Sequence, residues 1–283
     1  MRHKTSRSLT RYHLAVLLKW TILLFFLVFT FVPLVWLVLS SFKTNFEFET
    51  KPFALPAVWQ WGNYVKAIHI SGLPRLFFNS ILVSSLATVV NLLVSAMAAF
   101  VLSRLRFPLQ NVILTTLTAG VLIPIIALMV PYFSIIRALG LYDTLGGLII
   151  TYASINIPIS VFLLHGFMRT LPKELEEAAV IDGCSLFQRF SRIVLPLSQL
   201  GIVTAGTFVF LYCWNEFLYA MLLTSSVASR TIQLGIRFFT SQFFIDYTAM
   251  YAAIVITIVP TVVVYILFHD KIVRGLTSGA VKG

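Results

Sequence analysis

Charged residues are scarce in this 283-residue chain, and acidic residues are the scarcest of them. Only 11% of the residues are Asp, Glu, Lys or Arg, whereas about a quarter are charged in an ordinary soluble domain. Hydrophobic residues make up 59% of the chain, and the mean hydropathy is +0.93. This composition excludes an ordinary soluble domain and predicts an integral membrane protein.

Cysteine and catalytic motifs are also lacking. The chain has two cysteines, and the topology derived below places Cys184 in the cytoplasm and Cys213 in the bilayer, which argues against a disulfide framework. There is no G-x-x-x-x-G-K-[ST] phosphate loop, no His, Cys and Glu set at metal-ligand spacing, and no nucleophile grouped with a base and an acid in a loop. We therefore expect no ATPase, metal, cofactor or catalytic site in this chain.

The net charge of +11 does not predict a nucleic-acid partner. The basic residues flank apolar runs, as the positive-inside rule expects, and no nucleic-acid recognition motif is present. We therefore expect the lipid bilayer, and not a nucleic acid, as the surroundings of this chain.

Long apolar runs dominate the chain instead. Crossing roughly 30 Å of hydrocarbon takes about 20 helical residues, and an isolated strand cannot satisfy its backbone in lipid. We predict an all-α membrane protein with six transmembrane helices in a domain at residues 14–268, after a segment at 1–13 and before a tail at 269–283. The predicted spans are Leu14–Ser41, Phe77–Leu102, Leu109–Ile136, Leu145–Phe167, Leu197–Leu223 and Thr248–Phe268.

The basic residues predict the orientation of these spans. An even number of spans places both termini on one side, which would hold thirteen Lys and Arg residues against seven on the other side, with Lys19 near the start of the first span. Cytoplasmic loops carry the excess of Lys and Arg. We therefore expect both termini, and the loop 172–196, in the cytoplasm.

The most polar long segment is Pro172–Pro196. Pro172 suits the first position of a helix, three Glu residues suit its N-terminal end, and Gly183 is a natural stop. A second, amphipathic helix is predicted after it, with Leu186, Phe187, Phe190 and Ile193 on its apolar face. The pattern fits a compact knob that enters a groove of a partner protein, and it fits equally an amphipathic pair lying on the lipid surface.

Polar residues within the apolar runs are candidates for a solute path, because polar groups in a membrane face the bundle interior or a watery cavity. Asn91, Asn156, Asn215 and Glu216 are such residues. Glu216 is the only acidic residue deep in an apolar run, and its alternative role is that of a structural partner for a neighbouring helix.

A gapped motif decides between the two interpretations of the polar segment. Glu177-Ala178-Ala179, followed after three residues by Gly183 and after nine more by Ile193-x-Leu195-Pro196, resembles the EAA signature of permeases of binding-protein-dependent ABC importers. The chain departs from that family's usual pattern at Cys184, where alanine is common, and at Leu200, where proline is common.

The resemblance extends along nearly the whole chain and is closest to the maltose-type, carbohydrate-importing subfamily. The further matching motifs are Ser40-Ser41-Phe42-Lys43, Asn63-Tyr64, Asn79-Ser80, Ala98-Ala99-Phe100, Ser103-Arg104, Leu139-Gly140-Leu141, Trp214-Asn215-Glu216-Phe217, Thr231-Ile232-Gln233-Leu234-Gly235, and the tail from Gly275.

The resemblance implies a type I ABC importer permease in a bacterial or archaeal cytoplasmic membrane. It implies a second homologous permease chain, two copies of a cytoplasmic ABC ATPase that uses ATP and Mg, an extracytoplasmic solute-binding protein, and a sugar as substrate. The loop 172–196 would be the coupling helix that docks on the ATPase. Its expected coupling residues are Glu177, Ala178, Ala179, Asp182, Gly183, Leu186, Phe187 and Phe190, and Gly279, Val281 and Lys282 of the tail would make a second ATPase contact.

The hypothesis from the sequence is therefore a non-catalytic permease subunit of an importer for a sugar or oligosaccharide. One alternative is the same machine carrying another solute, such as glycerol phosphate. A second alternative is an ion-driven carrier, in which Glu216 and His165 would exchange protons or sodium.

Overall fold

The computed structural model describes residues 3–70, 72–236 and 246–280, and all the regular structure in these residues is helical. The all-α prediction is confirmed for this part of the chain. The chain forms two compact units. Unit 1 comprises Met1–Ser71 and Phe238–Ile256, and unit 2 comprises Gly72–Arg237 and Thr257–Gly283.

Unit 1 contains the long helix α1 (His3–Ser41), the short helices α2 (Asn45–Thr50) and α3 (Gly62–Ile70), and the first turns of α15 (Tyr247–Ala280). An 18-residue apolar window of α1, within Tyr12–Ser41, has no buried residues. Because water does not tolerate an apolar surface of this size, α1 requires lipid or another protein around it.

Hydrogen bonds fold the loop that follows α1. Lys43 is fully buried, and its Nζ donates to the backbone oxygens of Lys51 at 3.0 Å and Pro52 at 2.8 Å. Asn63 Nδ2 donates to the backbone oxygens of Ser41 and Lys43, at 2.8 Å each. Two of the motifs found in the sequence therefore bind each other, since Ser41 and Lys43 belong to the first and Asn63 to the second.

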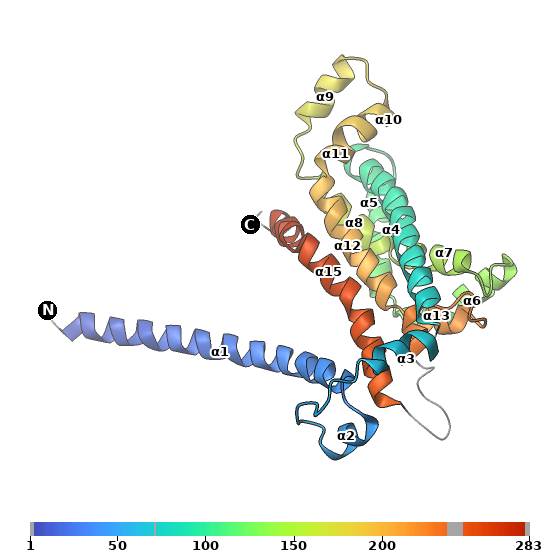
Figure 1. Ribbon diagram of the computed structural model, residues 1–283. Coiled ribbons are helices and arrows are strands. Elements are labelled where there is room, and N and C mark those ends of the chain that lie inside the picture. The colour runs from blue at the N-terminus through green and yellow to red at the C-terminus, as the bar shows by residue number, and fades with distance from the viewer. Residues whose placement is uncertain (1–2, 71, 237–245, 281–283) are drawn as a thin grey trace. The chain divides into compact units, whose positions relative to one another are not determined.

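The central helix of unit 2 is α4 (Leu73–Arg104), which packs against α7 (Leu145–Ile155), α8 (Ile157–Met168) and α12 (Gln199–Asn215), as Figure 1 shows. Small residues recur at helical spacing along its buried face, and they allow the neighbouring helices to approach closely. These buried small residues are Ser80, Ser84, Ala87, Ser95, Ala96 and Ala99.

The beginning of α4 holds the segment that leads into α14 (Ile232–Gly235). Asn79 Nδ2 donates to the backbone oxygens of Ala228 and Arg230, at 2.9 Å each, and the backbone N–H of Ile232 donates to Ser80 Oγ at 2.8 Å. A second pair of sequence motifs is therefore joined by hydrogen bonds.

Asp143 ties the loop before α7 to the segment after α13 (Leu218–Leu223). Its Oδ1 accepts hydrogen bonds from Ser229 Oγ and from the backbone N–H groups of Ser225, at 2.8 Å, and Ser226, at 3.0 Å. These donors, Ser229 first, hold the pKa of Asp143 well below its usual range. The carboxylate therefore stays charged at neutral pH.

The third apolar run, predicted as one span, is sharply bent in the structure. It consists of α5 (Gln110–Ala119) with the 3₁₀ turn η1 (Gly120–Leu122), and of the 3₁₀ turn η2 (Ile125–Leu128) with α6 (Met129–Ala138). The two parts meet at 104°. Pro124 lacks an N–H and disfavours the helical conformation of the residue before it, and Ile123 is extended with ψ 122°.

The fourth and fifth runs are also interrupted. α7 and α8 meet at 46°, and Glu216 and Phe217 separate α12 from α13. Three helices are long and apolar enough to span a membrane alone, at Tyr12–Ser41, Leu73–Arg104 and Tyr247–Gly275. Three bent pairs would bring the number among the described residues to six: the two pairs above and a third, Leu186–Leu197 with Gln199–Asn215, whose parts meet at 77°.

The break between α7 and α8 is stabilised from α4. Pro158 has no N–H for a helical hydrogen bond, and Asn156, two residues before it, lies in a turn between the two helices. The fully buried Asn91 of α4 donates from Nδ2 to the backbone oxygen of Ala153 at 2.8 Å, and its Oδ1 accepts from Ser160 Oγ at 2.6 Å. Because backbone groups within hydrocarbon need partners inside the protein, Asn91 is explained as a helix partner and not as a solute contact.

Two glycines provide a test of the packing between α8 and α12. A Cβ at Gly201 would lie 2.7 Å from Phe167 Cγ, whereas a Cβ at Gly166 would meet nothing within 4 Å. We predict that Gly201→Ala lowers the free energy of unfolding by about 1–3 kcal/mol through overpacking, and that Gly166→Ala is neutral or slightly stabilising. Thermal unfolding of both variants in a mild detergent measures this, and equal melting temperatures would contradict the packing described.

Candidate functional site

The polar segment 172–196, called the knob below, projects from unit 2 at the end where α4 finishes (Figure 1). Its first helix, α9 (Glu174–Ile181), starts two residues after the predicted Pro172. Three glutamates lie in the first turn of α9, where they complement the positive end of the helix dipole.

Gly183 ends α9 with a Schellman motif. The backbone N–H of Cys184 donates to the oxygen of Ala179 at 2.9 Å, and the N–H of Gly183 donates to the oxygen of Val180 at 3.0 Å. This motif requires a left-handed residue, and Gly183 has φ +79°. The predicted end of the first helix at Gly183 is therefore confirmed.

The second helix of the knob begins with a capping box. Ser185 Oγ accepts from the backbone N–H of Gln188 at 3.3 Å, and Gln188 Oε1 accepts from the N–H of Ser185 at 2.8 Å. The chain continues as α10 (Leu186–Arg189), a π-helical turn η3 (Phe190–Val194) and the short α11 (Leu195–Leu197).

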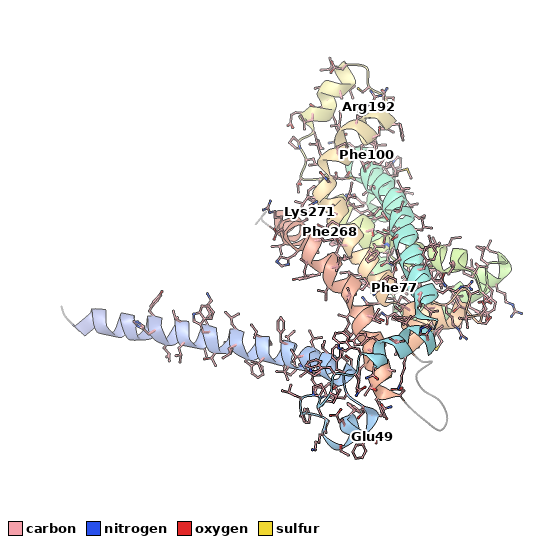
Figure 2. All side chains as sticks on the ribbon, viewed as in Figure 1. Glu49, Phe77, Phe100, Arg192, Phe268 and Lys271 are labelled. Atoms are coloured by element: carbon pink, nitrogen blue, oxygen red, sulfur yellow. The ribbon has the colours of Figure 1, made fainter. Side chains whose placement is uncertain are left out.

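The residues of the predicted apolar face differ in their exposure. Phe187 is 71% exposed, whereas Phe190 is 9% exposed and its ring lies 5.2 Å from that of Phe100, near the end of α4 (Figure 2). Phe190 and Val194 join a buried cluster with residues of α4, α8 and α12. Phe190 therefore attaches the knob to this chain and is not available to a partner in this structure.

A buried ion pair makes the second attachment of the knob. Arg104 Nε, at the end of α4, lies 2.7 Å from Glu176 Oε1 in α9, and both side chains are less than one tenth exposed. Arg104 Nη2 also donates to the backbone oxygen of Leu171 at 3.3 Å. Neither residue is recognisable as a site residue from its sequence context, although Arg104 ends the motif Ser103-Arg104.

The outward face of the knob carries both apolar and acidic groups. Ile181 is 86% exposed, and Leu186 is also exposed. Glu177, Ala178, Asp182 and Gly183 are exposed, whereas Ala179 is buried. Of the residues expected to couple to a partner, Ala179 and Phe190 therefore face inward and the others are accessible.

Beside Asn91, described above, two of the remaining three candidate solute-path residues are held by this chain itself. Glu216 is buried, and its carboxylate accepts from Tyr152 Oη at 2.6 Å and from the N–H groups of Tyr219 at 2.8 Å and Ala220 at 3.0 Å. Glu216 thereby caps the N-terminus of α13, which agrees with its alternative role as a structural partner for a neighbouring helix. Asn156 Nδ2 donates to the backbone oxygen of Tyr152 at 2.8 Å.

Asn215 differs from these two residues because it is exposed. Its Nδ2 donates to the backbone oxygen of Leu211 at 2.8 Å, and its Oδ1 lies 3.5 Å from Gln233 Nε2. Tyr152 is hydrogen-bonded to both Asn156 and Glu216, whereas Asn215 is bonded to neither of them in the hydrogen bonds described here.

The predicted second contact surface in the tail is described only in part. The backbone of Gly279 lies in the last turn of α15, whereas Val281 and Lys282 lie outside the described residues.

A double-mutant cycle tests whether the buried ion pair fixes the knob. Removing one partner leaves the other charge buried and unpaired, so Glu176→Gln alone should cost about 3 kcal/mol in the free energy of unfolding, and Arg104→Gln alone a similar amount. We predict that Arg104→Gln/Glu176→Gln costs less than the sum by at least about 1 kcal/mol. The measurement is reversible denaturation in detergent, and strictly additive costs would show that the two groups do not interact.

Permeases from several organisms are similar to this chain. A sulfoquinovosyl glycerol transport system permease protein of Agrobacterium fabrum is 35% identical over 89% of this chain and 88% of its own length. A diacetylchitobiose uptake system permease protein of Streptomyces coelicolor is 34% identical over 95% and 87%. A trehalose/maltose transport system permease protein of Thermococcus litoralis is 33% identical over 89% and 91%.

The fold also has a counterpart among solved structures. A chain of a bacterial ABC transporter involved in the import of the acidic polysaccharide alginate superposes with a TM-score of 0.82 at 20% identity, covering 91% of this chain and 96% of that chain. The family model for the binding-protein-dependent transport system inner membrane component matches residues 91–277, and this chain belongs to that family.

Proposed function

We propose that this chain is a permease subunit of an ATP-driven, binding-protein-dependent importer that moves a sugar or oligosaccharide across the cytoplasmic membrane. The observation that carries the proposal is a knob with an exposed apolar and acidic face, attached to a bundle of apolar helices by a buried ion pair and a buried aromatic pair. The relatives named above are permeases of transport or uptake systems for sulfoquinovosyl glycerol, diacetylchitobiose and trehalose/maltose, which supports the choice of solute class.

The knob is the proposed docking element for a cytoplasmic ATPase. Ile181, Leu186 and Phe187 would enter a groove of that partner, because exposed apolar side chains on a short helix are the anchors of such contacts. Glu177, Ala178, Asp182 and Gly183 would shape the same face, while Ala179 and Phe190 position it from within. Gly279, Val281 and Lys282 would add a second contact.

The proposed topology has six crossings with both termini in the cytoplasm. The distribution of cations in unit 2 supports it. Arg104, Arg106, Arg169 and Lys173 surround one cavity beside the knob, and Lys271 and Arg274 line another near the start of α12. An excess of Lys and Arg at one end of a bundle is the mark of the cytoplasmic side.

The remaining parts of the machine belong to other chains. ATP and Mg would be bound by two copies of the partner ATPase, a second homologous permease would complete the membrane bundle, and an extracytoplasmic binding protein would deliver the solute. Within this chain, Asn215 is the proposed solute contact among the three candidates, because Asn156 and Glu216 already bind the interrupted helices.

The hydrogen bonds of Glu216 weigh against an ion-driven carrier. Such a carrier needs a carboxylate that exchanges a proton or cation, whereas both oxygens of Glu216 accept hydrogen bonds from this chain. Uptake by proteoliposomes that contain the co-purified complex tests the mechanism. We expect sugar to accumulate only when ATP is supplied on the side of the membrane where the ATPase is bound. Uptake driven by an ion gradient without ATP would overturn the proposal.

Phe187→Ala tests the docking role of the knob. Loss of an exposed aromatic anchor should weaken assembly with the ATPase and lower ATP-dependent uptake about tenfold, while the melting temperature of the chain stays unchanged. Phe162→Ala is the matched control, because Phe162 is a similarly exposed phenylalanine on α8, away from the knob. Equal uptake by the two variants would show that Phe187 docks nothing.

A further inference from the structure

A basic cavity lies beside the knob, at the end of unit 2 where α4 and α8 finish and α5 begins. Its volume is about 300 Å³, and four cationic residues contribute to its walls: Arg104, Arg106, Arg169 and Lys173. Arg104 also attaches the knob through Glu176, whereas neither the coupling role nor the solute path uses Arg106, Arg169 or Lys173. A cluster of four cations around a space of this size calls for a ligand of opposite charge.

Only one of the four cations is neutralised by the protein. Arg104 is paired with Glu176, and within residues 3–70, 72–236 and 246–280 no other carboxylate reaches ion-pair distance of a cation in this cavity. Arg106, Arg169 and Lys173 are exposed and keep their charge unpaired. The cavity is therefore strongly positive even after the ion pair is counted.

Arg104 contributes a second, independent observation. Its side chain is 4% exposed, yet its Nη1 is buried and has no hydrogen-bond partner among the described residues. Leaving a buried donor of a charged group without a partner is costly, so a missing acceptor at this position is indicated. An oxyanion is the acceptor that a guanidinium binds most strongly.

The apolar neighbours identify the source of the oxyanion. Leu102, Leu105 and Leu114 line the cavity together with the cations, and Leu109 and Val112, close by on the chain, are exposed apolar residues. The cavity thus lies where apolar spans end, which is the depth of lipid headgroups. A partner's carboxylate would have to reach between membrane helices, whereas a lipid phosphate already lies at this level.

We propose that this cavity binds the phosphate of an anionic phospholipid, with Arg106, Arg169 and Lys173 as its charged contacts and Arg104 Nη1 as its buried donor. Basic pockets between membrane helices on the cytoplasmic side are suited to anionic headgroups, and the inference relies on the proposed cytoplasmic orientation of this end.

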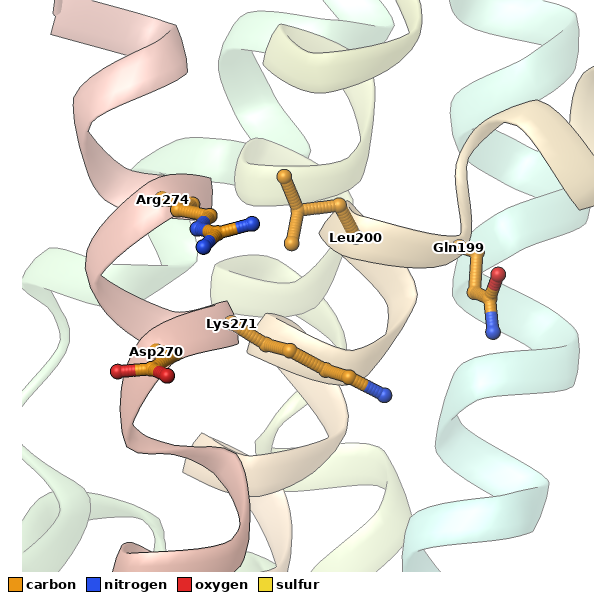
Figure 3. Close-up of a pocket in the computed structure, with 5 residues that line it drawn as sticks. All are labelled: Gln199, Leu200, Asp270, Lys271 and Arg274. Atoms are coloured by element: carbon orange, nitrogen blue, oxygen red, sulfur yellow. The ribbon is translucent and has the colours of Figure 1, made fainter.

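A second cavity with cationic residues in its lining lacks these features. It is formed by α12 and α15, with a volume of about 390 Å³, and Figure 3 shows Asp270 together with Lys271 and Arg274 along its wall. A carboxylate in the lining opposes an anionic ligand. The basic cavity is therefore the one assigned to the lipid.

Binding of lipid to the purified full chain in a non-ionic detergent tests the proposal. The probes are dioctanoyl phosphatidylglycerol and dioctanoyl phosphatidylcholine, and native mass spectrometry measures the share of chains that hold each lipid. We expect preferential retention of phosphatidylglycerol, and about 30-fold weaker retention in Arg169→Gln/Lys173→Gln, since each cation contributes about fivefold. Both residues are exposed, so the variant should keep its melting temperature.

Arg192→Gln/Lys271→Gln is the matched control, because it removes two exposed cations from the same end without touching the basic cavity (Figure 2). Its retention of phosphatidylglycerol should equal that of the unmodified chain. Equal retention of the two lipids, or equal losses in the two double variants, would overturn the proposal. Displacement of phosphatidylglycerol by an equal concentration of inorganic phosphate would make the cavity a free-phosphate site and overturn the lipid assignment. Unchanged retention in Arg169→Gln/Lys173→Gln would also overturn it and leave these cations for an acidic protein partner.

Discussion

The buried contact between Arg104 and Glu176 is the constraint on which the proposed mechanism depends. A docking element can move a membrane bundle only if it is attached rigidly, and a short helix pair held by backbone alone would bend at its hinges. The ion pair fixes α9 to the end of α4, and the packing of Phe190 on Phe100 fixes the next helix to the same end. Because α4 packs against α7, α8 and α12, a force on the knob reaches the centre of unit 2.

The interrupted helices complement this rigid axis. α7 and α8 are separate segments, as are α12 and α13, and side chains of this chain satisfy their freed backbone groups. Asn91 serves the first break and Glu216 the second. Such breaks are tolerated in a membrane only where the protein covers them, so they mark the interior of the bundle and define where helix segments can change their angle. In the proposed mechanism, α4 transmits the movement of the knob, and the helices bend at the breaks between α7 and α8 and between α12 and α13.

Much of the fold could be predicted from the sequence, because its signals are local. Apolar runs of sufficient length gave the helices, and Gly183 gave the turn of the knob, since only a left-handed residue closes that motif. Pro124 predicted a kink, but the 104° turn depends on how the two segments pack, which no local pattern encodes. The inward direction of Phe190 also escaped prediction, because it depends on packing against Phe100 and its buried neighbours, which are far away in the sequence.

Pairings between distant residues were the other part that the sequence could not provide. Arg104 ends the motif Ser103-Arg104 and Glu176 immediately precedes Glu177-Ala178-Ala179, and nothing in either stretch indicates that the two residues meet. Glu216 and Asn156 were selected because they are polar residues in apolar runs, and only their partners distinguish a structural group from a solute contact.

Site-directed crosslinking tests the central claim most directly. With Cys184 replaced by serine, a cysteine at Ile181 or Phe187 should form a crosslink to the co-expressed nucleotide-binding partner, and a cysteine at Phe162 should form none. In the unmodified chain we predict that the yield of this crosslink changes when ATP is added. Arg104→Gln should keep the crosslink but remove this dependence on ATP, because the knob still docks and no longer moves the bundle. Absence of any crosslink from positions 181 and 187, or their labelling only from outside the cell, would contradict the account.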